Sequence, residues 1–94
     1  IIFYDDNQQV TGSVLAEVEA VMTQYRGLID LITFNVGGDQ NSPEVLAAVT
    51  YASELGVAST PYIIIVDGGG YITWRSKGYT EQKVIQREVE RATR

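Results

Sequence analysis

The sequence predicts an α/β domain in which a mixed four-stranded sheet carries helices on both faces, in the order β-α-β-α-β-β-α. Four short β-rich runs are separated by amphipathic helical patterns or by a glycine turn. Two strands joined through a helix are expected to be parallel with a right-handed crossover, and the glycine turn makes the last two an antiparallel hairpin. The 94 residues support one small core, so residues 1–94 are assigned to a single domain.

The first half of the chain contains a strand, a helix and a second strand. Residues 1–4 form a short apolar run, read as a buried strand, and a polar loop follows it. Apolar residues then recur at helical spacing, with Thr11 or Ser13 as the expected N-cap and Gly27 as the stop. Residues 29–36 alternate and are rich in β-formers, which predicts the second strand.

The second half adds a helix, a hairpin and a last helix. Ser42, followed by proline and an acidic residue, predicts a helix start, and Gly56 predicts its end. Residues 62–66 are fully apolar and β-branched, so they predict a buried third strand. A glycine-rich turn leads to a fourth strand over residues 71–75, and Thr80 is the expected cap of the last helix.

Composition excludes several kinds of chemistry. The chain has no Cys and no His, so it contains no thiol nucleophile, no imidazole base and no thiolate or imidazole metal ligand. We therefore expect no catalytic residues, no cofactor and no metal site. Adjacent acids such as Asp5 and Asp6 are typical of a polar loop and do not indicate a hydrolase.

Charge and hydropathy limit the classes of partner. The formal net charge is −5, which disfavours binding to a nucleic-acid backbone. Basic residues gather late in the chain, interleaved with three glutamates, in the pattern of a solvated helix face; they are Arg75, Lys77, Lys83, Arg87, Arg91 and Arg94. No apolar run is long enough to span a bilayer, so we expect no membrane insertion.

One stretch carries a specific resemblance to a known family. Residues 56–70 read Gly-Val-Ala-Ser-Thr-Pro-Tyr-Ile-Ile-Ile-Val-Asp-Gly-Gly-Gly, and Tyr25-Arg26-Gly27 stands where a first helix closes. Together with Lys77-Gly78-Tyr79 and the element order, this resembles the thioredoxin-like superfamily over nearly the whole chain. The hairpin followed by Trp74 is similar to the extracytoplasmic thiol-disulfide branch, which favours that location without fixing the compartment.

The chain departs from that family where the chemistry would lie. Counting back from Tyr25-Arg26-Gly27, the family's Cys-x-x-Cys falls on Gln8-Gln9-Val10-Thr11. The family's buried acid in the first strand falls on Ile2. Glutamine cannot form the mixed disulfide on which thiol–disulfide exchange depends, so we expect a redox-inactive domain that is not an enzyme.

The remaining functional signal is the Thr60-Pro61 pair. The resemblance implies a cis peptide bond that exposes the backbone of Thr60 beside the first helix. An extended peptide could then pair with Thr60 in a groove. The residues expected to line this groove are Gln8, Gln9, Val10, Thr11, Ser59, Thr60, Pro61, Lys77, Gly78 and Tyr79.

We therefore expect a protein- or peptide-binding or assembly module. Two alternatives stay open: a domain of a longer thioredoxin-family oxidoreductase whose cysteines lie elsewhere or were removed, and a non-redox ligand-binding member of the fold. The chain does not begin with Met, which favours a piece of a longer protein. Either a monomer or a dimer formed through an edge strand is expected.

Overall fold

The computed structural model describes residues 1–39 and 41–93. Its element order agrees with the predicted β-α-β-α-β-β-α. The elements are β1 (Ile2–Tyr4), α1 (Gln9–Gln24), β2 (Thr33–Asn35), α2 (Pro43–Glu54), β3 (Tyr62–Val66), β4 (Ile72–Lys77) and α3 (Gln82–Thr93).

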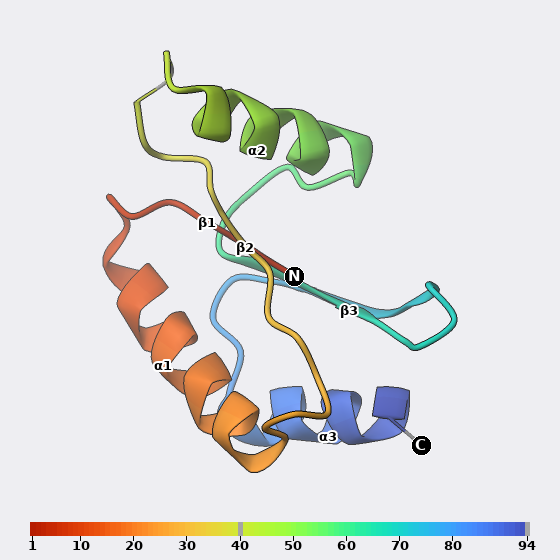
Figure 1. Ribbon diagram of the computed structural model, residues 1–94. Helices are drawn as coiled ribbons and strands as arrows, with labels where there is room; N and C mark the ends of the chain where they lie inside the picture. Colours follow the sequence, from red (N-terminus) through yellow and green to blue (C-terminus); the bar gives the residue numbers. More distant parts are fainter. Residues whose placement is uncertain (40, 94) are drawn as a thin grey trace.

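The strands form one mixed sheet in the order β2-β1-β3-β4. β1 and β2 are parallel, whereas β3 runs antiparallel to both β1 and β4. Figure 1 shows α2 on one face of this sheet and α1 and α3 on the other. The predicted mixed four-stranded sheet with helices on both faces is therefore confirmed.

The core is divided by the sheet into two apolar layers. On one side Ile2 and Ile63 pack with Val14 and Val18 of α1 and with Ile85 of α3. The other layer contains Phe3, Ala52 and Ile64. Phe3 and Ile64 are completely buried and Ile2 is 1% exposed. Because β1 is covered on both faces, all its core positions must be apolar, which explains the run at the start of the sequence.

The second strand is shorter than predicted. Residues 29–36 were expected to be β, but only Thr33–Asn35 forms β2. The partner strand explains this difference, because β1 contains only three residues to pair with. Ile2 N donates to Ile32 O and Val36 N donates to Tyr4 O. These two hydrogen bonds involve the first and last residues of β1, so β1 has no further residue with which β2 could pair. Similarly, β4 begins at Ile72 and runs to Lys77, later than the predicted 71–75.

The expected N-caps of two helices are wrong. α1 begins at Gln9 with Gln8 in the cap position, ahead of Thr11 and Ser13. The hydroxyl of Thr80 pairs with that of Ser76 at 2.8 Å and so does not cap α3. Long-range contact replaces the local cap, because the carboxylate of Glu17 in α1 accepts the amide N–H of Gln82 at 2.8 Å.

The remaining boundaries follow local sequence rules. Pro43 opens α2 after Ser42, as predicted, and the hydroxyl of Ser42 donates to Glu44 at 2.8 Å. Gly27 and Gly56 follow α1 and α2 with φ of +83° and +74°, a conformation that glycine adopts without a steric penalty. Within the described residues, no helix combines the length and apolar character needed to cross a membrane.

The contact between Glu17 and Gln82 gives a stability prediction. We expect Glu17→Ala to lower the free energy of unfolding by about 1 kcal/mol, because the first amide of α3 loses its acceptor. Glu19→Ala is the matched control, since Glu19 is exposed on the same helix. Urea denaturation measures both variants, and equal stability of the two would show that the cap contributes nothing.

Candidate functional site

The turn between β1 and α1 is organised by Asp5. Its carbonyl oxygen accepts the amide N–H of Gln8 at 3.0 Å and the hydroxyl of Thr11 at 2.7 Å. Its carboxylate accepts the amide N–H of Asn7 at 2.9 Å. These three bonds bend the chain sharply away from the sheet and start α1 only a few residues after β1 ends.

The same turn leaves the start of β3 without a partner strand. Ile1 exchanges two hydrogen bonds with Ile64, and Phe3 lies opposite Tyr62. Because hydrogen-bonded pairs alternate along an antiparallel ladder, the next pair would join Asp5 and Thr60. Asp5 has turned away, and no described residue hydrogen-bonds to the backbone N–H or C=O of Thr60. The Thr60–Pro61 peptide bond is cis, as predicted.

Two of the predicted site residues meet directly. The hydroxyl of Thr60 donates to Oε1 of Gln8 at 2.8 Å, although the two residues are 52 positions apart in the sequence. Gln8 is exposed and Thr60 is half-buried. The bond fixes the side-chain amide of Gln8 so that its Nε2 retains two N–H donors for another molecule.

The first turn of α1 adds further donors. The first amides of a helix lack intrahelical acceptors, and no described residue accepts the N–H of Gln9 or Val10. The first turn contains no acidic residue, and Gln8 makes no side-chain cap. The positive end of the helix dipole is thus free to attract a carbonyl or carboxylate oxygen. We call Gln8, Gln9, Val10 and Thr60 the Thr60 surface.

The other predicted site residues take different places. Thr11 is only 5% exposed and its hydroxyl is bound to Asp5, so it positions the turn. Gly78 donates its N–H to the carbonyl of Pro61 at 2.7 Å and has a φ of +79°. Ser59 and Lys77 are exposed, and within the described residues no hydrogen bond joins them to the Thr60 surface.

Tyr79 interacts with Glu17 of α1, about two helical turns beyond Gln9. Desolvation raises the pKa of its phenol, and the Glu17 carboxylate raises the pKa further by its charge and by accepting a hydrogen bond. The ring is still 51% exposed. Tyr79 is therefore a neutral phenol at ordinary pH, held against α1 by Glu17. Glu17 was missed by the sequence analysis because helical periodicity assigns its position to the polar face.

A loop network supports the turn from the neighbouring strand. Asn7 Nδ2 donates to Gly37 O at 2.9 Å, and Asn35 Nδ2 donates to the carboxylate of Asp6 at 3.0 Å. A Cβ added to Gly37 would lie 1.8 Å from Oδ1 of Asp5. The absence of a side chain at position 37 is thus what makes room for the Asp5 carboxylate.

A large cavity lies at the opposite end of the sheet. Its volume is about 730 Å³, and it opens between α1, α3, the loop before β2 and the end of β3. Aliphatic residues such as Met22, Ile32 and Val66 dominate its wall, and Asp30 and Asp67 are the titratable side chains among its described lining residues. None of the ten predicted site residues lines this cavity.

No protein-family model matches the chain, and no curated protein matches its sequence. The assignment of function therefore depends on the geometry of the Thr60 surface.

The contact between Thr11 and Asp5 generates a test of the turn. We expect Thr11→Val to lower the free energy of unfolding by about 1 kcal/mol, because the buried hydroxyl donor is lost while the shape of the side chain is kept. Thr23→Val is the matched control, since the Thr23 hydroxyl bonds to Glu19 O on the exposed side of the same helix. Equal effects of both substitutions in urea denaturation would contradict the proposed role of Thr11.

Proposed function

We propose that the chain is a thioredoxin-like domain without thiol chemistry that binds an extended peptide at the Thr60 surface. On this proposal it acts as a binding or assembly module and is not an enzyme. The sheet order β2-β1-β3-β4, with β3 antiparallel to β1, supports the resemblance drawn from the sequence. The cis Thr60–Pro61 bond beside the start of α1 supports it further.

The observation that carries the proposal is the unpaired backbone of Thr60. A peptide strand that passes this residue gains a donor and an acceptor at the position that Asp5 leaves empty. Its next carbonyl groups would face the amides of Gln9 and Val10 and the side-chain amide of Gln8. The set contains mostly donors, so it favours a ligand that turns oxygen acceptors toward it, and the backbone of an extended peptide supplies one C=O per residue.

Side chains of the ligand must supply much of the affinity. A hydrogen bond exchanged with water contributes only about 1 kcal/mol. The half-exposed ring of Tyr79, which follows the Gly78 that donates to Pro61 O, offers an apolar surface, with its phenol bonded to Glu17. We therefore expect selected peptides to carry an apolar or aromatic residue next to the one that pairs with Thr60.

Peptide selection tests the proposal. Random peptides displayed on phage are selected against the domain, and the bound peptides are mapped by the amide NMR shifts of the protein. We expect shifts at Gln9, Val10 and Thr60, and loss of binding in Gln8→Trp, whose ring would cover the surface. Gln24→Trp, at the other end of the same helix, is the matched control and should bind normally.

Failure of selection to yield any peptide, or unchanged binding by Gln8→Trp, would contradict the proposed site.

Restoring cysteines tests the thioredoxin-like part separately. Gln8 is exposed and Thr11 is buried one turn later, which is the arrangement of an accessible nucleophile and a protected resolving thiol. We expect Gln8→Cys with Thr11→Cys to form an intrachain disulfide and to reduce insulin disulfides with a thiol reductant present. Gln9→Cys with Gly12→Cys has the same spacing and should remain inactive. A folded but inactive first variant would remove support for the resemblance and leave the peptide experiment unaffected.

A further inference from the structure

The strand β4 lies at an edge of the sheet and presents unpaired backbone groups to solvent. Residues Ile63 and Ile65 of β3 face β4 in the ladder, because Ile64 is bonded to Ile1 on the other side. Ser76 and Trp74, opposite them, use their backbone groups within the sheet. The N–H and C=O groups of the intervening Arg75 and Lys77 therefore point away from it, and no described residue accepts or donates to them.

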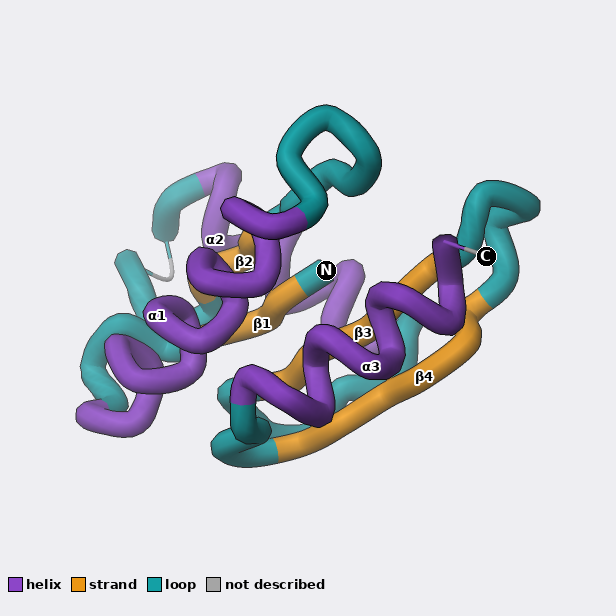
Figure 2. Tube along the Cα trace, turned by 90° about the horizontal axis from the view of Figure 1, so that it is seen from below, coloured by secondary structure: helices purple, strands orange, loops and turns teal. Residues whose placement is uncertain are grey.

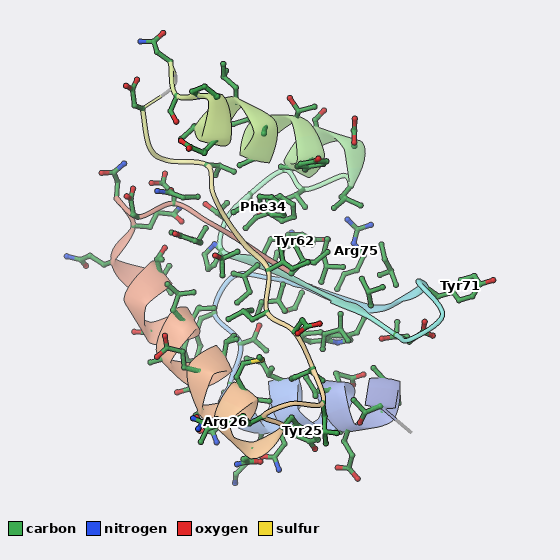
Figure 3. The ribbon with its side chains drawn as sticks, in the orientation of Figure 1. Tyr25, Arg26, Phe34, Tyr62, Tyr71 and Arg75 are labelled. Carbon is green, nitrogen blue, oxygen red and sulfur yellow. The ribbon has the colours of Figure 1, made fainter. Side chains whose placement is uncertain are left out.

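The edge is accessible along its length. Figure 2 shows β4 as the outermost strand, with α3 lying along the β3–β4 face without continuing the sheet. Figure 3 shows Arg75 and Tyr62 together on the opposite face, beneath α2, and Tyr71 pointing out from the hairpin tip. At six residues, β4 is the longest strand, so it offers the most extended template in the molecule.

β4 carries two basic residues, Arg75 and Lys77, and no acidic residue. Residues 75–94 contain six of the seven basic residues and three acidic ones, whereas residues 1–74 contain one basic and nine acidic residues. Arg75 and Lys77 are two residues apart in β4, so their side chains project from the same face of the sheet. Among the described residues, neither forms a salt bridge.

The positive charge of Arg75 is held in a fixed place. Its guanidinium donates to the carbonyl of Leu55 at the end of α2 and lies 5.4 Å from the centre of the Tyr62 ring. Neither contact neutralises the charge. An incoming carboxylate would thus meet an oriented cation whose side-chain entropy is already partly lost.

The same charges determine which strand can bind. In an antiparallel β4–β4 pair from two copies, the register that places Arg75 opposite Lys77 sets cation against cation, and like charges opposite one another are destabilising. Charged residues on an edge strand are a known protection against such self-association. An extended segment with acidic residues at alternate positions would instead place a carboxylate opposite each cation.

We propose that the open edge of β4 binds an acidic extended segment of a partner protein by antiparallel β-strand addition. The register sets the pattern of that segment from its N-terminus: an acid opposite Lys77, any residue opposite Ser76, an acid opposite Arg75, and an apolar residue opposite Trp74. This site is independent of the Thr60 surface, since it uses the outer edge of a different strand and none of the residues Gln8, Gln9, Val10 and Thr60.

A pair of isomeric peptides tests the proposal. One 12-residue peptide contains the acid-x-acid-apolar pattern, and its isomer places the same acids side by side. We expect the patterned peptide to bind at least tenfold more tightly by fluorescence anisotropy and to weaken as salt is raised. Arg75→Glu should weaken it at least tenfold, whereas Arg26→Glu, which changes the net charge equally at the far end of α1, should not.

Amide hydrogen exchange gives a readout that does not depend on substitutions. We expect the amides of Arg75 and Lys77 to exchange rapidly in the free protein and at least tenfold more slowly with the patterned peptide, while those of Trp74 and Ser76 stay slow throughout. Equal binding of the isomers, or equal weakening by Arg26→Glu and Arg75→Glu, would overturn the proposal. Protection of Arg75 and Lys77 in a dimer of the protein alone would assign the edge to a second copy and overturn it as well.

Shifts confined to Gln9 and Thr60 would assign the peptide to the Thr60 surface and also overturn it. Loss of the phage-selected peptides in Gln8→Trp would concern the Thr60 surface alone and would leave the proposal for β4 unchanged.

Discussion

The hydrogen bonds to the carbonyl of Asp5 are the interaction on which the rest of the structure depends. By accepting from Gln8 and Thr11, this one oxygen ends the pairing of β1 with β3 and starts α1 in the same step. A chain that continued straight would have satisfied the backbone of Thr60 within the sheet. The turn therefore creates both parts of the Thr60 surface, the unpaired strand residue and the free helix amides beside it.

The strands differ in how deeply they are buried, and this decides which of them can expose polar groups. β1 is an inner strand of the sheet and is covered on both faces, so the buried side chains of Ile2 and Phe3 cannot contact another molecule. β4 lies at the edge of the sheet and carries both charged residues of the strands, Arg75 and Lys77. The small size of the domain makes this division strict, because a core of two thin layers cannot accommodate an unpaired polar group. Glu88, 4% exposed, is tolerated there with Arg87 and Arg91 at 3.5 and 3.4 Å.

Sequence reasoning predicted the architecture because its signals are local. The apolar run of β3, the proline that opens α2 and the glycine after it each act within a few residues. The cis bond before Pro61 was also expected, from a resemblance and not from periodicity. The length of β2 could not be predicted, because it is set by the length of its partner β1.

The site was predicted only in part for the same reason. Contact between Gln8 and Thr60 follows from the position of the cis bond, which the resemblance supplied. Glu17, which caps α3 and touches Tyr79, acts across 65 and 62 positions of sequence, where no local pattern reaches. The direction in which Thr11 points is set by its hydrogen bond to the backbone carbonyl of Asp5. Every residue has such a carbonyl, so the sequence does not show which one a side chain will meet.

Glycine at position 37 constrains how this sequence can change during evolution. Asp5 and Gly37 occupy one volume between them, since a Cβ on Gly37 would overlap the carboxylate of Asp5. Position 37 cannot gain a side chain while the Asp5 carboxylate keeps its present place, whereas a smaller residue at position 5 would leave room for one. Among descendants of this sequence, a larger residue at 37 should arise together with a smaller one at 5. Covariation of these two positions would record the turn even where the residues of the Thr60 surface have diverged.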